Sequence, residues 1–288
     1  MENNENEKFI QRKNILKKIE EYELEGKFDQ DVEDDPPTIV LEEDKVDYLN
    51  KNLSSKIKTI IANKVASDFF MKLIKNNQVI IKEINGVENL KDISSGAVIT
   101  CNHFNPFDSF TVEYCLKKSN LLRNKKLYKV IREGNYTNFP GLYGFFFKNC
   151  NTLPLSSSVN TMEKFTMATN SILKRGDYIL IYPEQSMWWN YKKPKPLKKG
   201  AFKIACKNEV PILPIFITMK ESNIMGDDGF KIMEYYVNIC KPIHMDGSKN
   251  IKENIDSMKI KNYNEWKEVY ETFYNKKLEY TTKKDVKI

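Results

Sequence analysis

The chain has 288 residues, of which 41% are hydrophobic and 12% aromatic, and its formal net charge is +7. This composition fits a globular protein of one large or two small domains. No stretch approaches the ~20 uninterrupted apolar residues that span a bilayer, and we find no secretory signal. The five cysteines are scattered without Cys-x2-Cys spacing, which argues against a zinc site and indicates a reducing, cytosolic compartment.

Charge is spread unevenly along the chain. Residues 1–44 carry 6 Lys and Arg against 15 Asp and Glu, whereas the remaining residues carry 40 against 24. A basic body favours an anionic partner, namely lipid headgroups, nucleic acid or a phosphorylated cofactor. Residues 7–26 show helical spacing, and residues 27–44 have the composition of a linker. We expect residues 1–44 to form an acidic N-terminal arm, either docked on the basic body or solvated.

Residues 45–76 show a long amphipathic pattern. Apolar side chains recur at i, i+3 and i+4 over about eight turns, with lysines between them. One interpretation is a helix packed on the domain with its lysines solvated. The other is a basic helix on an anionic membrane surface, with residues 69–71 inserted. Residues 45–77 are therefore a separate helical segment, and the second interpretation predicts a cytoplasmic protein bound peripherally to the inner face of the membrane.

From residue 78 to residue 288, short apolar runs alternate with helical patterns, which is typical of an α/β domain. The spacing predicts strands over 78–83, 97–101, 127–131, 151–155, 178–182, 212–218 and 233–240. It predicts helices over 108–118, 158–174, 199–208 and 251–281. There is no internal repeat, no GxGxxG and no nucleotide-type phosphate loop.

One stretch between a predicted strand and a predicted helix carries acid–base chemistry. Residues 102–108 read NHFNPFD, which places His103 on the loop and Asp108 in the first turn of the helix. A histidine held by a carboxylate is a general-base arrangement, because the carboxylate fixes the tautomer and stabilises the imidazolium. A histidine and an aspartate that merely cap a helix are the simpler alternative.

Two later segments also carry candidate functional residues. Residues 181–186, IYPEQS, end a predicted strand, so Glu184 is expected at the crevice where α/β sheets bind ligands. Residues 187–191, MWWNY, precede a cluster of lysines, which can hold a phosphate beside an apolar chain or a base, or can simply be solvated. Residues 209–217, EVPILPIFI, predict a buried strand that opens with a proline.

Together these segments resemble the glycerolipid acyltransferase family, which includes 1-acyl-glycerol-3-phosphate (lysophosphatidate) acyltransferases. Residues 102–108 match its Asn-His-x4-Asp motif, residues 182–186 its Phe-Pro-Glu-Gly-Thr-Arg motif, and residues 210–214 its Val-Pro-Ile-x-Pro motif. The resemblance covers about residues 78–243 and implies a mixed, mostly parallel sheet flanked by helices. It identifies residues 78–288 as an acyltransferase domain of phospholipid biosynthesis.

The resemblance also implies site residues. His103 and Asp108 would be catalytic, and the implied substrate-binding residues are Asn102, Glu184, Gln185 and Ser186. Gln185 stands where the family has glycine, and Met187 where it has an arginine thought to hold the acceptor's phosphate. A second family arginine is missing after residues 153–155. We expect nearby lysines to substitute, namely Lys192 and Lys193, or Lys148.

The expected reaction starts with His103 taking a proton from the acceptor hydroxyl, which then attacks an acyl-CoA or acyl-carrier-protein thioester. The partners are thus a lysophospholipid, an acyl thioester and an anionic membrane surface, with no metal, no other cofactor and no nucleic acid. Two alternatives remain: a thioester or lipid hydrolase that uses Cys101 as nucleophile, and a non-catalytic lipid-binding protein.

Overall fold

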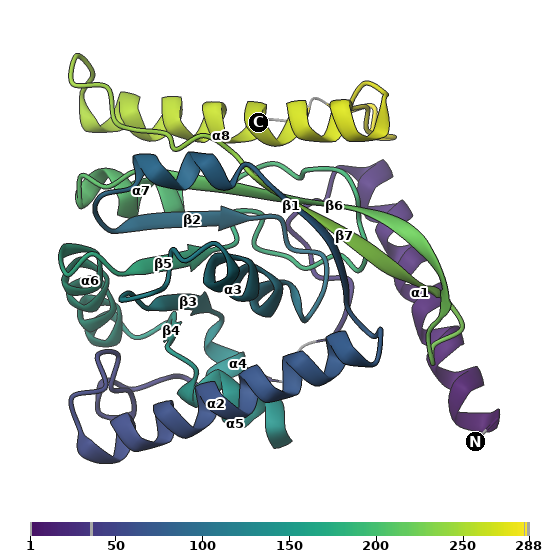
Figure 1. Cartoon of the computed structure of the whole chain (residues 1–288), viewed down its shortest axis with the longest axis horizontal. Coiled ribbons are helices and arrows are strands. Elements are labelled where there is room, and N and C mark those ends of the chain that lie inside the picture. The colour runs from purple at the N-terminus through teal and green to yellow at the C-terminus, as the bar shows by residue number, and fades with distance from the viewer. Residues whose placement is uncertain (1, 35–36, 285, 287–288) are drawn as a thin grey trace.

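A seven-stranded sheet forms the centre of the computed structural model, which describes residues 2–34, 37–284 and 286 (Figure 1). The strands follow the order β1-β7-β6-β2-β5-β3-β4 across the sheet. Neighbours from β6 to β4 are parallel, whereas β7 is antiparallel to β6 and parallel to β1. The sheet is therefore mixed and mostly parallel, as expected. The strands are β1 Ile80–Asn85, β2 Ala97–Cys101, β3 Leu127–Ile131, β4 Thr152–Pro154, β5 Tyr178–Ile181, β6 Ile212–Met225 and β7 Lys231–Ile239.

Helices cover both faces of the sheet. On one face lie α6 Val159–Lys174, α7 Gly200–Lys207 and α8 Ile251–Tyr274, and on the other lie α2 Leu53–Lys75 and α3 Asp108–Lys118. Side chains of β2 alternate between the two faces, with Val98 toward the first and Ile99 toward the second. Because β2 is buried on both faces, its sequence is a continuous apolar run rather than an alternating one.

The remaining helices lie around this core. α1 Glu2–Glu25 forms the first part of the arm, and α4 Glu133–Asn138 and α5 Gly141–Asn149 connect β3 to β4. Two short 3₁₀ segments occur at Glu43–Lys45 and Val87–Asp92. None of the helices in the described part of the chain has both the length and the apolarity that a bilayer crossing requires.

The predicted strands and helices are all present, with three main differences in length. The helix predicted over 45–76 begins only at Leu53, because Asp47 accepts the backbone N–H groups of Lys51 and Asn52 and so turns the chain. The helix predicted over 251–281 ends at Tyr274, where the next residue is left-handed with φ 49°. β6 continues to Met225, beyond the predicted 212–218, because β7 pairs with it from Ile215 to Met225, with one irregularity after Glu221.

The sequence pattern predicts neither α4 nor α5. α5 contains three consecutive phenylalanines, and its apolar side chains point both inward, as Phe146 does, and outward, as Leu142 does. Without a single apolar stripe, such a segment carries no helical periodicity.

The acidic segment that follows α1 docks on the rest of the molecule. Phe28 and Val32 are buried in a cluster with Ile19 of α1 and Trp188. Trp188 Nε1 donates a hydrogen bond to the carbonyl of Gln30 at 2.9 Å. Of the two states expected for the arm, the structure therefore has the docked one over residues 27–34.

Candidate active site

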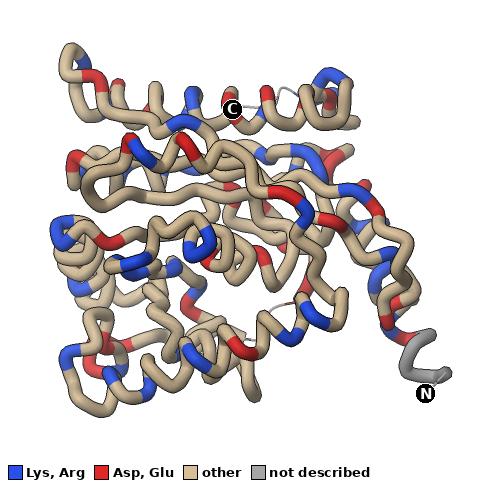
Figure 2. Tube along the Cα trace, viewed as in Figure 1, with Lys and Arg blue, Asp and Glu red and all other residues tan. Residues whose placement is uncertain are grey.

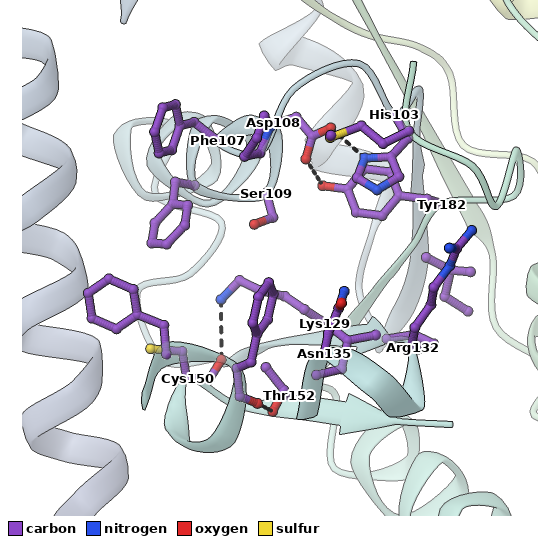
Figure 3. Close-up of a pocket in the computed structure, with 18 of the residues that line it drawn as sticks. His103, Phe107, Asp108, Ser109, Lys129, Arg132, Asn135, Cys150, Thr152 and Tyr182 are labelled. Atoms are coloured by element: carbon purple, nitrogen blue, oxygen red, sulfur yellow. Dashed lines mark hydrogen bonds and ion pairs between the residues drawn. The ribbon is translucent and has the colours of Figure 1, made fainter. Parts of the chain in front are cut away.

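Neighbouring parallel strands bring candidate residues to one edge of the sheet. β2, β5 and β3 lie side by side and run in the same direction, so their carboxyl ends meet there. The residues that follow these ends are His103 after β2, Tyr182 after β5 and Arg132 after β3. All three line one cavity (Figure 3).

His103 is held by Asp108, the first residue of α3. His103 Nδ1 lies 2.7 Å from Asp108 Oδ2, and the backbone N–H of Phe104 donates to the same oxygen at 3.2 Å. A carboxylate can only accept hydrogen bonds, so Nδ1 carries the proton and Nε2 presents a lone pair. The pair predicted from the sequence is therefore formed with the geometry of a general base.

Tyr182 contacts both members of this pair. Its hydroxyl donates to Asp108 Oδ1 at 2.6 Å, and its ring stacks on the His103 imidazole with centroids 4.1 Å and planes 18° apart. Burial, together with the charge of Asp108, raises the pKa of Tyr182 well above its usual range, so the hydroxyl keeps its proton. Tyr182 thus fixes the carboxylate and the orientation of the imidazole at the same time.

Glu184 braces the loop that carries His103. Its Oε2 accepts the backbone N–H of His103 at 3.0 Å, and its Oε1 accepts that of Lys195 at 2.7 Å. The Lys195 ammonium lies 3.9 Å from Glu184 and donates to the hydroxyl of Ser186 at 2.8 Å. Burial raises the pKa of Glu184 and lowers the pKa of Lys195 to about 8. This buried network holds the histidine loop from behind.

The cavity beside His103 has a volume of about 1070 Å³ and a mainly apolar lining. Its aromatic wall comes from α2, α3 and α5, and includes Phe70, Phe107, Phe110, Tyr143 and Phe146. In the view of Figure 3, Arg132 lies on the opposite side of the cavity from Phe107. His103 therefore faces a space that has both an apolar region and a charged region.

A partly buried ion-pair group also lines this cavity. Lys129 of β3 places its Nζ 2.6 Å from Glu113 Oε2, and Lys117 places its Nζ 2.7 Å from Oε1 of the same carboxylate. Burial raises the pKa of Glu113, but the two lysines more than offset this and lower it to about 2. The group joins α3 to β3 and stays ionised at neutral pH.

Residues 82–218 match the protein-family model described as Acyltransferase. This part of the chain belongs to the acyltransferase family. The match includes His103, Asp108 and Glu184, and it excludes the acidic arm, α2 and α8. The resemblance stated from the motifs is thereby confirmed over these residues.

Comparison with other proteins adds little to this assignment. No curated protein matches the chain. Among solved structures, the acyltransferase is similar to the 1-acyl-sn-glycerophosphate (LPA) acyltransferase PlsC from Thermotoga maritima, with 17% identity and a TM-score of 0.47. The alignment covers 75% of this chain and 84% of that chain.

The residues predicted to bind substrate lie in different places in the acyltransferase. Gln185 lines the cavity and has φ 68°, a conformation that favours the glycine of the family motif. Asn102 is buried, and its side chain accepts the backbone N–H of Ile217 at 2.8 Å, which ties β2 to β6. Glu184 and Ser186 are buried too, and the Ser186 hydroxyl donates to the carbonyl of Phe28 in the arm at 2.8 Å. These three brace the site from outside the cavity wall.

The predicted phosphate-binding lysines point elsewhere. Neither Lys192 nor Lys193 is among the described residues that line the cavity, and Lys193 Nζ donates to Glu23 Oε1 of α1 at 2.6 Å. The basic residue at the strand edge is instead Arg132, which the sequence reasoning missed. A signal was present, because Arg132 directly follows the strand predicted over 127–131.

Cys101 is poorly placed to act as a nucleophile. Its side chain is fully buried within β2, and this burial raises the pKa of the thiol well above its usual range. A thiol that stays protonated is a weak nucleophile. The geometry therefore opposes the hydrolase alternative.

Proposed function

We propose that this acyltransferase moves a fatty acyl group from an acyl-CoA or acyl-carrier-protein thioester to a hydroxyl of a lysophospholipid such as lysophosphatidate, in phospholipid biosynthesis. The observation that carries the proposal is the His103–Asp108 pair, with its Nδ1–Oδ2 distance of 2.7 Å, on the wall of a mainly apolar cavity. A base of this kind suits deprotonation of a hydroxyl, and the apolar volume suits an acyl chain.

The proposed mechanism needs one proton carrier. His103 Nε2 takes the proton of the acceptor hydroxyl while Asp108 stabilises the imidazolium that forms. The acceptor oxygen bonds to the thioester carbonyl carbon, the carbon–sulfur bond then breaks, and the imidazolium returns the proton to the thiolate. No acyl-enzyme forms, and the acyl thioester is the only co-substrate that this chemistry requires.

The two regions of the cavity suit the two ends of the substrates. The aromatic wall, with Phe107, Phe110 and Phe146, suits the acyl chain, because burying CH₂ groups is worth about 0.8 kcal/mol each. Arg132 suits the acceptor's phosphate, because a guanidinium can bind phosphate oxygens through two parallel hydrogen bonds. In this proposal Arg132 takes the role that the sequence had suggested for Lys192 and Lys193.

A membrane surface would supply the lysophospholipid, and one of the two apolar stripes of α2 suits contact with such a surface. One stripe, with Ala66 and Phe70, is buried against the domain. The other is exposed, and lysines are spread along the same helix (Figure 2). The exposed stripe consists of Leu53, Ile57, Ile60, Ile61 and Val65. We propose that this stripe and the lysines rest on an anionic membrane, on its cytoplasmic face.

The test is an acyl-transfer assay. Purified protein is incubated with radiolabelled acyl-CoA, or acyl-carrier protein, and a panel of lysophospholipids, and the products are separated. Acylated phospholipid is expected. Free fatty acid without acylated lipid would instead establish a hydrolase, and neither product with any donor would leave a lipid-binding protein.

A further inference from the structure

The acidic arm reaches the charged region of the cavity. Asp31 pairs with Arg132. The two nearby carboxylates of the arm have other partners: Asp29 pairs with Lys198 at 2.7 Å, and Glu33 pairs with Arg12 at 3.3 Å. Asp29, Asp31 and Glu33 all line the cavity, although the arm lies outside the part of the chain that matches the acyltransferase family.

Asp31 binds Arg132 in the way that a phosphate would. Arg132 Nη1 donates to Asp31 Oδ2 at 2.5 Å and Arg132 Nη2 donates to Oδ1 at 2.7 Å, which is a two-pronged pair. Nη2 also lies 3.3 Å from the carbonyl of Gln185. A guanidinium forms the same parallel hydrogen bonds with carboxylates and with phosphates. The two anions therefore compete for the same face of Arg132.

The balance of energies indicates which part would move. The Asp31 and Arg132 side chains are 40% and 38% exposed, and a pair so exposed is worth only up to about fivefold in an equilibrium. Moving the arm itself would expose Phe28 and Val32, and each such buried side chain is worth about tenfold or more. The face of Arg132 that Asp31 occupies is thus opened by a rotation of the Asp31 side chain, with the arm still docked.

We propose that Arg132 is a phosphate-binding residue and that Asp31 is an internal competitor that weakens its hold on phosphate monoesters. The assignment of the phosphate to an acceptor lipid rests on the proposed function. When a phosphate monoester arrives, Asp31 turns away and the phosphate takes its place. Asp31 thereby lowers the apparent affinity of the site for phosphate by the fraction of time that Arg132 is occupied.

The test measures phosphate binding without catalysis. Glycerol 3-phosphate is titrated into the full-length protein by calorimetry, with glycerol as the uncharged comparison. Asp31→Asn should tighten binding of glycerol 3-phosphate about 3- to 10-fold, since both the competition and a nearby negative charge are removed. Arg132→Gln alone should weaken binding of glycerol 3-phosphate. Combined with Asp31→Asn, it should abolish the gain in affinity.

A matched control separates direct competition between Asp31 and phosphate from the electrostatic field of the acidic arm as a whole. Asp29→Asn removes the same charge from the same segment, but its partner is Lys198, so glycerol 3-phosphate binding should change less than about twofold. Equal tightening by both variants would overturn the proposal, as would unchanged or weaker binding by Asp31→Asn. Asp31→Ser also removes the carboxylate and should tighten glycerol 3-phosphate binding as Asp31→Asn does. A melting temperature close to that of the wild type in each variant checks that the arm remains docked.

Turnover then separates this inference from the proposed function. With acyl-CoA fixed, Asp31→Asn should lower the KM for lysophosphatidate and leave the KM for acyl-CoA within about twofold. Acyl transfer by the wild type with no effect of Asp31→Asn would refute the competitor alone. Tighter phosphate binding in a protein that acylates no lysophospholipid would refute the proposed function and keep the competitor.

Discussion

The imidazole of His103 is fixed from two directions, by the Asp108 carboxylate at 2.7 Å and by the stacked ring of Tyr182. His103→Ala should lower kcat by about 10²–10⁴-fold without unfolding the protein, because the general base is lost. Asp108→Asn should also be severely impaired, since an amide cannot stabilise the imidazolium. Cys101→Ser is the control and should keep most of the activity; its inactivation would revive the cysteine hydrolase. Acyl transfer from a long-chain donor is the measurement.

Tyr182→Phe isolates the hydroxyl that donates to Asp108 at 2.6 Å, because the stacked ring remains. A hydrogen bond to a charged group is worth about 1.5–3 kcal/mol, so kcat/KM should fall about tenfold or more. Tyr182→Leu removes the stacked ring as well and should lose more activity. A kcat/KM of Tyr182→Phe equal to that of the wild type would show that the hydroxyl only packs.

The contact between His103 and Asp108 could be predicted from the sequence because the two residues are five positions apart on one strand-to-helix connection. Tyr182 and Arg132 could not be placed, because their proximity to His103 depends on the strand order β2-β5-β3. Glu184 was found as a motif residue, but its role as a brace became visible only from its bonds to the backbone of His103 and Lys195.

At the scale of elements, α2 exposes a stripe of apolar residues beside its buried stripe. Ile57 and Ile60 are 50% and 70% exposed, so replacing both by glutamate should leave the fold intact. Binding to anionic vesicles should fall at least tenfold, because two apolar contacts are lost and two negative charges approach the headgroups. Vesicle co-sedimentation at low salt measures this.

The control for this prediction is Met167→Glu on α6, which is 70% exposed on the other face of the sheet and should leave vesicle binding unchanged. Wild-type protein that fails to bind anionic vesicles would contradict the membrane role of α2. The exposed stripe would then need another partner.

Glu113 links α3 to β3 through Lys129, and its pKa is lowered to about 2 because the attraction of two lysines outweighs burial. A lowered carboxyl pKa adds stability above the unfolded pKa, about 4.5, that is lost as the pH falls toward 2. Removing one partner of a buried pair costs about 3–5 kcal/mol, so Glu113→Gln should be strongly destabilised at pH 7.

Urea unfolding between pH 7 and pH 2.5 tests this assignment. The variant should lose stability less steeply than the wild type below pH 4.5, because the titrating carboxylate is absent. Glu163→Gln, on the exposed face of α6, should follow the wild-type curve. Parallel curves for the wild type and Glu113→Gln would contradict the buried ion pair.

Most elements could be predicted because their apolar residues follow a helical period of 3.6, as in α6, or form a short continuous apolar run, as in β2. α5 could not, because its aromatic residues serve the core, α2 and the cavity wall in turn and so follow no period. The mostly parallel sheet followed from the family motifs, whereas the antiparallel pairing of β7 with β6 needed the structure.

At the scale of the whole molecule, Glu23 joins three distant parts of the chain. Its carboxylate accepts hydrogen bonds from Lys193, from the hydroxyl of Tyr191, and from the backbone N–H of Thr281 near the C-terminus. Contacts between residues so far apart in sequence leave no local pattern. The docking of the arm was therefore left open by composition and was decided only by the fold.

Glu23→Gln should lower the free energy of unfolding by about 1–3 kcal/mol, because a buried charged acceptor is replaced by a neutral one. The segment after Tyr274 should also be cleaved faster by protease. Glu25→Gln, which breaks only an exposed pair with Lys27, is the control and should change little. Equal resistance to protease in both variants would show that Glu23 does not hold the C-terminal segment.

The aromatic cluster under the arm has a consequence for synthesis of the protein. Tyr280 packs against Phe28, and its hydroxyl donates to the carbonyl of Pro194. The arm and the segment after α8 therefore both contact the loop behind His103. A ribosome makes Phe28 long before Tyr280. A nascent chain therefore cannot hold this loop in place until Tyr280 has left the ribosome. Chains truncated before Tyr280 should lack this support of the loop behind His103.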